Sequence, residues 1–129
     1  MHPRPTSRRD AGMVTAETAV LMPVLVVVLA AAVFVLACVA GQLKCVDAAR
    51  SAARLAARGE AVSTVATTAE RLAPAGARVV VAPGPGLGDA ATVEVVVHAQ
   101  VRPFGRALRV LPGVRVSARA VAAVEPGAP

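Results

Sequence analysis

Glu17 is the side chain whose place in the sequence could do the most specific chemistry. It is the last charged residue before a run of 26 uncharged residues, 18–43, which ends at Lys44. A carboxylate near the start of a helix complements the positive end of the helix dipole at little cost. A carboxylate deeper in a membrane costs ~2.5–3.5 kcal/mol, and pairing it with a cation offsets that cost. Both roles, a dipole contact and a pairing site, are open for Glu17.

Other residues that could do chemistry are few, and they form no recognisable catalytic or metal-binding pattern. His98 lies on a predicted strand without a nucleophile or a paired acid, and the serines lack a triad setting. Cys38 and Cys45 lie about 10 Å apart if one helix carries both, too far for a mutual disulfide. We predict that Cys38 is a small membrane-facing residue, whereas Cys45 could cross-link two chains in an oxidising compartment. The sequence predicts no enzyme, metal, cofactor or small-molecule substrate.

The uncharged run is long enough to cross a membrane. As a helix, Ala19 to Ala40 reaches about 33 Å at ~1.5 Å per residue, enough to span the hydrocarbon core. Pro23 lies inside this helix, where it removes one backbone hydrogen bond and is predicted to kink the chain. A secretory signal has a shorter apolar core of ~7–15 residues, and a lipoprotein signal ending at Cys38 has the bulky Leu36 where a small residue is favoured. An uncleaved membrane anchor is a further alternative.

The residues around the start of the apolar run resemble those of a known family. An arginine-rich tail ends in Gly12, the apolar Met13 follows, and Glu17 stands five residues after the glycine. This pattern resembles the cleavage region of type IV prepilins and pseudopilins. Residues 14–23 resemble the opening of TadE-like proteins of the Flp/Tad pilus assembly system. Two later stretches are similar to actinobacterial TadE-like proteins: residues 42–60 and 114–122.

The resemblance implies a minor pilin or pseudopilin that a prepilin peptidase processes after Gly12. Cleavage would free the amine of Met13, and Glu17 would neutralise the amine of a neighbouring subunit during assembly. Pro23 would be a regular feature of the helix. The implied partners are membrane lipid, other pilin-like subunits, the pilus assembly machinery and the peptidase. The resemblance also places the N-terminus in the cytoplasm and the rest outside, an orientation that the basic residues flanking the run do not decide.

Composition limits the size and the partners of the remaining chain. The sequence has 129 residues, a mean hydropathy of +0.63 and 56% hydrophobic residues. Residues 44–129 have room for one small domain, which buries limited surface and is only marginally stable alone. The net charge is +6, but Tyr and Trp are absent as stacking platforms and no known nucleic-acid-binding module appears. We therefore expect no nucleic-acid partner.

Hydrophobic periodicity predicts an α+β fold: a long N-terminal transmembrane helix, a short second helix and a small three-stranded antiparallel sheet, which the resemblance makes pilin-like. The long helix is predicted over Val14–Arg58, ends at Gly59 and carries a basic stripe at Arg50, Arg54 and Arg58. The predicted regions are an unstructured leader or cytoplasmic tail (1–12), a transmembrane helix (13–43), an extracytoplasmic helical region (44–73) and a sheet region (74–129).

The later elements follow from apolar spacing and turn residues. They are a helix over Glu60–Ala73 and strands over Arg78–Ala82, Ala91–Arg102 and Val114–Val124, with a turn-rich loop at Pro83–Asp89, a long connection at Pro103–Gly113 and a tail at Glu125–Pro129. In the middle strand Val93, Val95, Val97, Ala99 and Val101 are predicted to face in, and Thr92, Glu94, His98, Gln100 and Arg102 to face out. The unpaired edges of so small a sheet invite a partner strand.

Two functional classes fit these observations. The first is a TadE-like minor pilin or pseudopilin that takes part in pilus assembly after its leader is cleaved. The alternative is an uncleaved single-pass envelope protein with a small extracytoplasmic interaction domain. Both predict a cell-membrane location, one membrane crossing and an extracytoplasmic C-terminal region.

Overall fold

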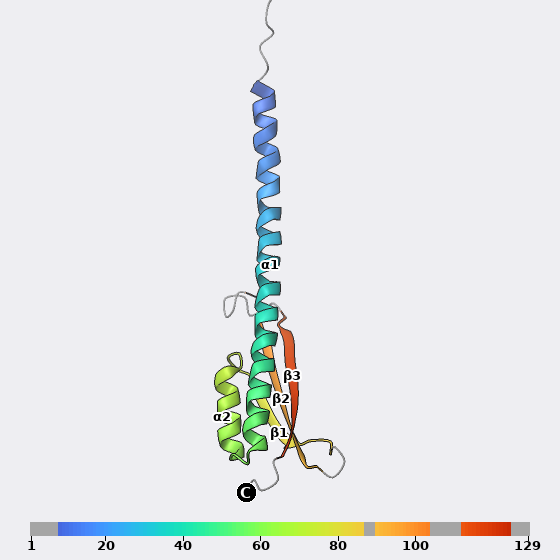
Figure 1. Ribbon diagram of the computed structural model, residues 1–129. Helices are drawn as coiled ribbons and strands as arrows, with labels where there is room; N and C mark the ends of the chain where they lie inside the picture. The colour runs from blue at the N-terminus through green and yellow to red at the C-terminus, as the bar shows by residue number, and fades with distance from the viewer. Residues whose placement is uncertain (1–7, 87–89, 104–111, 125–129) are drawn as a thin grey trace, which may run out of the picture. The chain divides into compact units, whose positions relative to one another are not determined.

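The chain folds into a long helix, a short helix and a three-stranded antiparallel sheet, in that order (Figure 1). The computed structural model describes the backbone of residues 8–86, 90–103 and 112–124, with side chains from residue 16 onward. The chain divides into two compact units, Met1–Val35 and Leu36–Pro129; we call the second the head unit. The predicted α+β fold is confirmed.

Helix α1 covers Arg8–Ala57 and therefore begins earlier than the predicted Val14. The prediction of an unstructured leader is wrong for residues 8–12. Arginine and alanine, which make up most of this stretch, are good helix formers, and lengthening an existing helix is far easier than starting one. Gly12 costs only ~1 kcal/mol relative to alanine. Pro23 lies inside α1, which continues through it; the kink at this residue stays a prediction.

The end of α1 is a Schellman motif at the predicted stop. The N–H of Glu60 donates to the carbonyl of Leu55 at 3.3 Å, and the N–H of Gly59 donates to the carbonyl of Ala56 at 3.1 Å. Gly59 has a φ of +78°, a left-handed conformation that only glycine adopts without steric cost. The chain then enters helix α2, Val62–Leu72, which is two residues shorter at its start than predicted and one shorter at its end.

The sheet has the strand order β1-β2-β3, and both neighbouring pairs are antiparallel. The strands are β1 (Arg78–Pro83), β2 (Thr92–Val101) and β3 (Val114–Ala123). Each boundary lies within one residue of its prediction. Since β2 pairs with both neighbours, its inward-facing side chains form the centre of the sheet's buried face.

Two turns flank β1. Before it, the N–H of Ala77 donates to the carbonyl of Pro74 at 3.0 Å, and Gly76 supplies the positive φ of +78° that the turn requires. After it, the Oγ1 of Thr92 donates to the carbonyl of Pro85 at 2.8 Å. This bond satisfies a hydroxyl that is buried, so the prediction that Thr92 faces out is wrong. Parts of three predicted segments lie outside the described residues: 87–89, 104–111 with Phe104, and 125–129.

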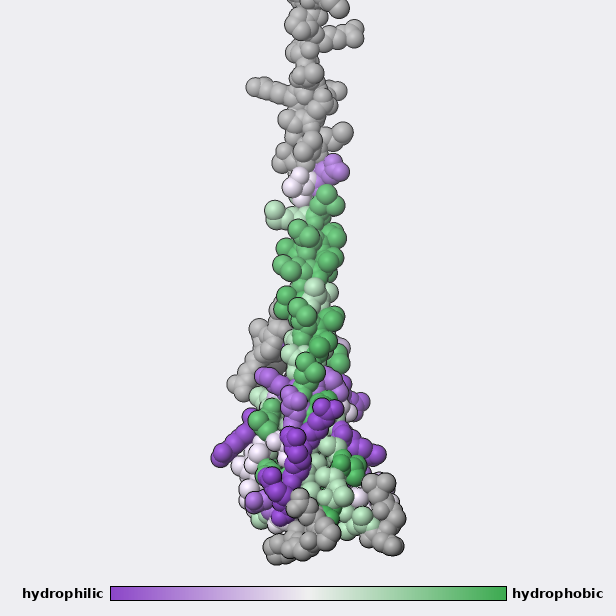
Figure 2. Space-filling model, viewed as in Figure 1, coloured by the Kyte–Doolittle hydropathy of each residue, from purple (hydrophilic) through white to green (hydrophobic). Residues whose placement is uncertain are grey.

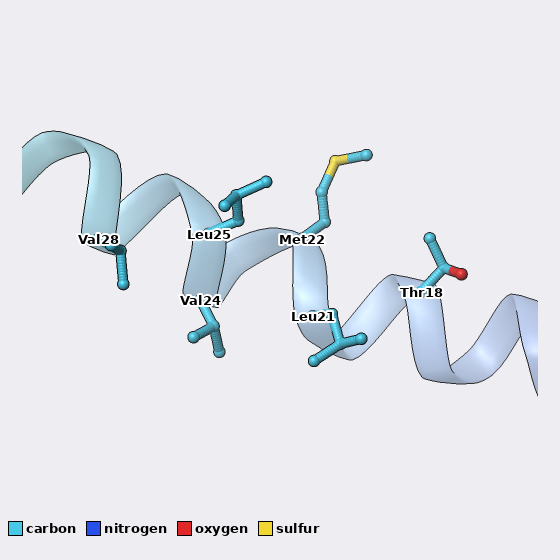
Figure 3. A pocket seen from close by; sticks show the side chains of 6 residues that line it. All are labelled: Thr18, Leu21, Met22, Val24, Leu25 and Val28. Atoms are coloured by element: carbon cyan, nitrogen blue, oxygen red, sulfur yellow. The ribbon is translucent and has the colours of Figure 1, made fainter.

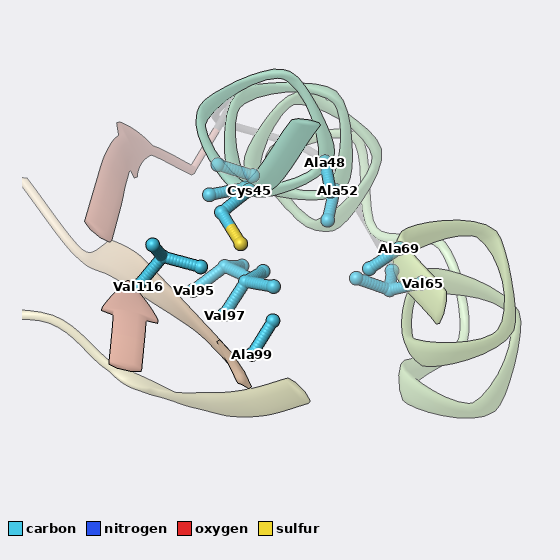
Figure 4. Packing of buried hydrophobic residues seen from close by; sticks show 11 residues of the cluster. Cys45, Ala48, Ala52, Val65, Ala69, Val95, Val97, Ala99 and Val116 are labelled. Atoms are coloured by element: carbon cyan, nitrogen blue, oxygen red, sulfur yellow. The ribbon is translucent and has the colours of Figure 1, made fainter. Parts of the chain in front are cut away.

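The core of the head unit lies between one face of the sheet and the two helices (Figure 4). Val95, Val97 and Ala99 of β2 are buried beneath α1 and α2, as predicted. The α1 side of this core consists of small residues: Cys45, Ala48, Ala49, Ala52 and Ala53. Short side chains let the helix backbone approach the sheet closely. From α2 only Val65 and Ala69 are buried; Val62 and Leu72, at the ends of α2, are exposed.

Helix α1 lies close to side chains of the sheet at Gly41. A Cβ at this position would lie 2.6 Å from Cγ2 of Val101, closer than real Cβ atoms approach a neighbour. The next residue, Gln42, donates from Nε2 to the carbonyl of Ser117 at 2.8 Å. That carbonyl belongs to edge strand β3, so Gln42 satisfies one acceptor on a strand that has a ladder partner on one side only within the described residues.

Candidate functional site

The N-terminal unit presents an apolar helix surface that carries one acid. Val20, Leu21 and Leu25 are 69%, 58% and 68% exposed, and Glu17 is exposed one turn before them. Figure 2 shows hydrophobic residues over the visible face of this part of α1. Among the described residues, one helix, Ala16–Ala57, is long and apolar enough to cross a membrane, and its apolar window is not buried. An exposed surface of this composition requires an apolar environment.

A shallow apolar depression lies on the same helix (Figure 3). Its lining comprises Thr18, Leu21, Met22, Val24, Leu25 and Val28. These side chains all come from α1. Among the described residues of the N-terminal unit, no second element covers the depression. Lipid chains or another apolar helix have the chemistry to fill it.

The four residues singled out by the sequence all lie on α1. Gly12 and Met13 are in its first turns, where the backbone is described and the side chains are not. Glu17 follows Met13 by four residues, so the two positions lie on one face of the helix a turn apart. Pro23 lies further along the same helix. The cleavage role of Gly12 and Met13 and the assembly role of Glu17 stay predictions.

Most of the described charged side chains of the head unit are exposed. Arg50 and Arg54 on α1 and Arg58, the first residue after it, are exposed while Ala49, Ala53 and Ala57 are buried, as the predicted basic stripe requires. Sequence reasoning missed one ion pair, in which Nε of Arg119 donates to Oε1 of Glu94 at 2.8 Å. The pair joins β3 diagonally to β2, so finding it requires the strand register.

No catalytic constellation appears in the described part of the chain. His98 is exposed on β2, as predicted for a strand histidine on the wet face. Among the described residues, no three histidine, cysteine, aspartate or glutamate side chains lie close enough to hold a metal ion.

The two cysteines have different surroundings. Both are free thiols; Cys38 is half-buried, and Cys45 is completely buried in the head core. The hypothesis that Cys45 cross-links two chains is therefore wrong, because β2 and β3 cover the side of α1 that carries its sulfur (Figure 4). Burial raises the pKa of the Cys45 thiol, since desolvation disfavours the thiolate.

We expect the two thiols to report on the folding of the head unit. In nonionic detergent, N-ethylmaleimide should alkylate Cys38 at least about ten-fold faster than Cys45, because the reacting thiolate must be both formed and reached. Mass spectrometry of peptides from a timed reaction measures the ratio, and denaturant should abolish it. Equal rates in the folded protein would contradict the burial of Cys45.

The fold and the site together define a small α+β head unit joined to an apolar N-terminal helix, compatible with a single-pass membrane protein. The chain is 35% identical over 111 residues to the protein named "Apoptosis inhibitor Rv3655c" from Mycobacterium tuberculosis. The match covers 86% of this chain and 78% of the mycobacterial protein, so it includes both the apolar helix and most of the head unit. The chain belongs to the family of this mycobacterial protein. No family model matches the chain, and no solved structure matches it.

Proposed function

We propose that this chain is a TadE-like minor pilin or pseudopilin, which takes part in assembly of a Flp/Tad-type pilus after a prepilin peptidase cleaves it behind Gly12. The observation that carries the proposal is the exposed apolar surface of α1, with Glu17 at its start, five residues after that glycine. A soluble protein would bury such a helix, whereas a membrane subunit exposes it to lipid and to neighbouring helices.

Cleavage would create the second half of an ion pair. It frees the α-amine of Met13, which is cationic at neutral pH because its ordinary pKa is ~7.7–8.0. The carboxylate of Glu17 on a neighbouring subunit is then its counter-ion. Pairing these two charges at the membrane offsets the cost of holding either one in an apolar environment. Before cleavage the amine does not exist, so processing would control the timing of assembly.

The proposed location follows from the same role. The protein spans the cell membrane once, with its leader in the cytoplasm and its head unit outside. Its partners are membrane lipid, other pilin-like subunits, the assembly machinery and the prepilin peptidase. The packed alanine face of α1 is already covered by the sheet and α2, so contacts with other subunits would use the apolar segment before Gly41 and the exposed head surface.

N-terminal sequencing of the membrane-embedded protein tests the cleavage. The protein is produced with and without a prepilin peptidase, beside a Gly12→Leu variant whose added side chain occupies the proposed cleavage position. We expect a chain beginning at Met13 only for the unchanged sequence with the peptidase present. An intact leader in that sample would instead support the alternative, an uncleaved single-pass envelope protein with a small interaction domain.

Inhibition of apoptosis is a second candidate, which rests on the name of the mycobacterial relative. The purified protein would be added to cells in which apoptosis has been induced, and caspase activity would be measured. A dose-dependent decrease that is lost after heat unfolding would favour this candidate, and no decrease would remove it.

A further inference from the structure

The outer face of the sheet, opposite the two helices, divides into a neutralised end and a cationic end. Along most of β1 and β3, exposed residues alternate with half-buried or buried ones, and His98 and Gln100 of β2 are exposed on either side of the buried Ala99. At one end, the carboxylate of Glu94 accepts the 2.8 Å bond from Arg119. At the other end, Arg78 of β1, His98 and Gln100 of β2 and Arg115 of β3 line a common cleft with Gly76 and Ala99. We call these four side chains the cationic corner.

The strand register brings the corner together from distant parts of the sequence. Arg78 pairs with His98, and Gln100 pairs with Arg115. With strands ~4.8 Å apart and ~3.4 Å per residue along a strand, the Cα atoms of Arg78 and Arg115 lie about 12 Å apart. Two extended arginine side chains can therefore point at one small group placed above His98 and Gln100.

The positive charge of the corner is not balanced by an acidic residue in the described lining of the cleft. No carboxylate lines the cleft within the described part of the chain, and the acid of this face, Glu94, is engaged with Arg119. The Oε1 of Gln100 accepts a bond of 3.1 Å from Nη2 of Arg102. Its amide nitrogen is a further hydrogen-bond donor, and the imidazole of His98 can also donate a hydrogen bond. The side chains of the corner thus include two cations and no anion.

We propose that the cationic corner binds a phosphate group. Two guanidinium groups match the charge of a phosphate monoester, about −1.5 to −2 at pH 7, whereas a single carboxylate would leave one of them uncompensated. The cleft has a volume of about 270 Å³, below the ~300–1,000 Å³ of pockets that enclose whole ligands. It can therefore hold a phosphate group, while the rest of the molecule that carries this phosphate stays in solvent. Phe, Tyr and Trp, the usual stacking platforms of a nucleic-acid site, are not among its described lining residues.

An NMR titration of the full chain in nonionic detergent tests this proposal. Inorganic phosphate is added at constant ionic strength, and the backbone amide shifts of Arg78, Gln100 and Arg115 are followed. We expect saturable shifts confined to the corner. Arg78→Gln or Arg115→Gln should each weaken binding about ten-fold, the effect of one charged hydrogen-bonding group. Arg119→Gln, which removes the same charge from the same face, should change the Kd less than about two-fold.

A second titration, with a short-chain phosphatidic acid below its micelle concentration, identifies the source of the phosphate. Equal affinity for both probes would indicate a soluble phosphate compound, and tighter binding of the lipid would indicate a headgroup. The proposal is overturned if chloride reproduces the shifts, if they do not saturate, or if Arg119→Gln weakens binding as much as Arg115→Gln. Protection of Cys45 from alkylation in every variant shows that the head unit stays folded, so a loss of binding cannot come from unfolding.

Discussion

Replacing Ala52 with aspartate is expected to unfold the head unit. Ala52 of α1 is completely buried in the core of the head unit, and none of the described residues that are buried there is a cation that could pair with a carboxylate. Desolvating the charge costs several kcal/mol and the extra volume costs ~1–3 kcal/mol. A unit of this size has a free energy of unfolding of only about 5–14 kcal/mol. The substitution should therefore remove most or all of that stability.

The same substitution at Ala61 is the matched control, and it should raise the free energy of unfolding of the head unit instead of lowering it. Ala61 is the N-cap of α2, has a non-helical backbone conformation (φ −56°, ψ 136°) and makes no side-chain capping bond. An aspartate there can accept a hydrogen bond from the first turn of α2 and should stabilise the head unit by ~0.5–2 kcal/mol. Both stability changes are measured by urea unfolding, with circular dichroism and Cys45 alkylation as the two probes of the folded state. If Ala52→Asp unfolded at the same urea concentration as the unchanged protein, the described core would be wrong.

Glu17→Ala is expected to spare cleavage of the leader and to prevent assembly. The substitution lies beyond the cleavage bond, so the peptidase should still produce a chain that begins at Met13. A charge-assisted hydrogen bond contributes ~1.5–3 kcal/mol, so its loss should lower recovery of the protein with other pilin-like subunits by at least about ten-fold. Co-purification after mild cross-linking measures the recovery, with the N-terminus sequenced in the same sample.

Two further variants separate charge from shape in this experiment. Glu17→Gln keeps the size and polarity but not the charge, and it should behave like Glu17→Ala. Glu17→Asp keeps the charge on a shorter side chain and should recover part of the assembly. Normal assembly of Glu17→Ala would show that the carboxylate is not a counter-ion, while leaving the cleavage step intact.

The elements of the fold were predictable because local signals agree with the tertiary structure. Strand alternation around Val95 and Val97, the glycine stop at Gly59 and the spacing of alanines along α1 each have one structural solution. The start of α1 was not predictable in this way, because a polar leader that contains Gly12 predicts no helix. In the structure the helix that follows is extended backward through this leader to Arg8. Thr92 was misplaced because its partner, the carbonyl of Pro85, is set by the path of a loop.

The features of the candidate site that depend on consecutive residues were also predictable, whereas those that depend on tertiary packing were not. Glu17 and Pro23 could be singled out because the apolar run around them is a property of consecutive residues. The burial of Cys45 could not, because Cys38 lies seven residues before it on a similar helix face, and only the docking of the sheet distinguishes them. The cationic corner likewise requires the strand order and register, which bring Arg78 and Arg115 beside β2 from 37 residues apart.

The side of the membrane on which the head unit folds tests the central proposal most directly. Alkaline phosphatase, which is active only outside the cytoplasm, and a green fluorescent protein that folds only inside it are each fused after Pro129. The pilin-like assembly role predicts an active phosphatase and a dark fluorescent fusion in membranes that contain the protein. A fluorescent fusion with an inactive phosphatase would place the head unit in the cytoplasm and contradict that role.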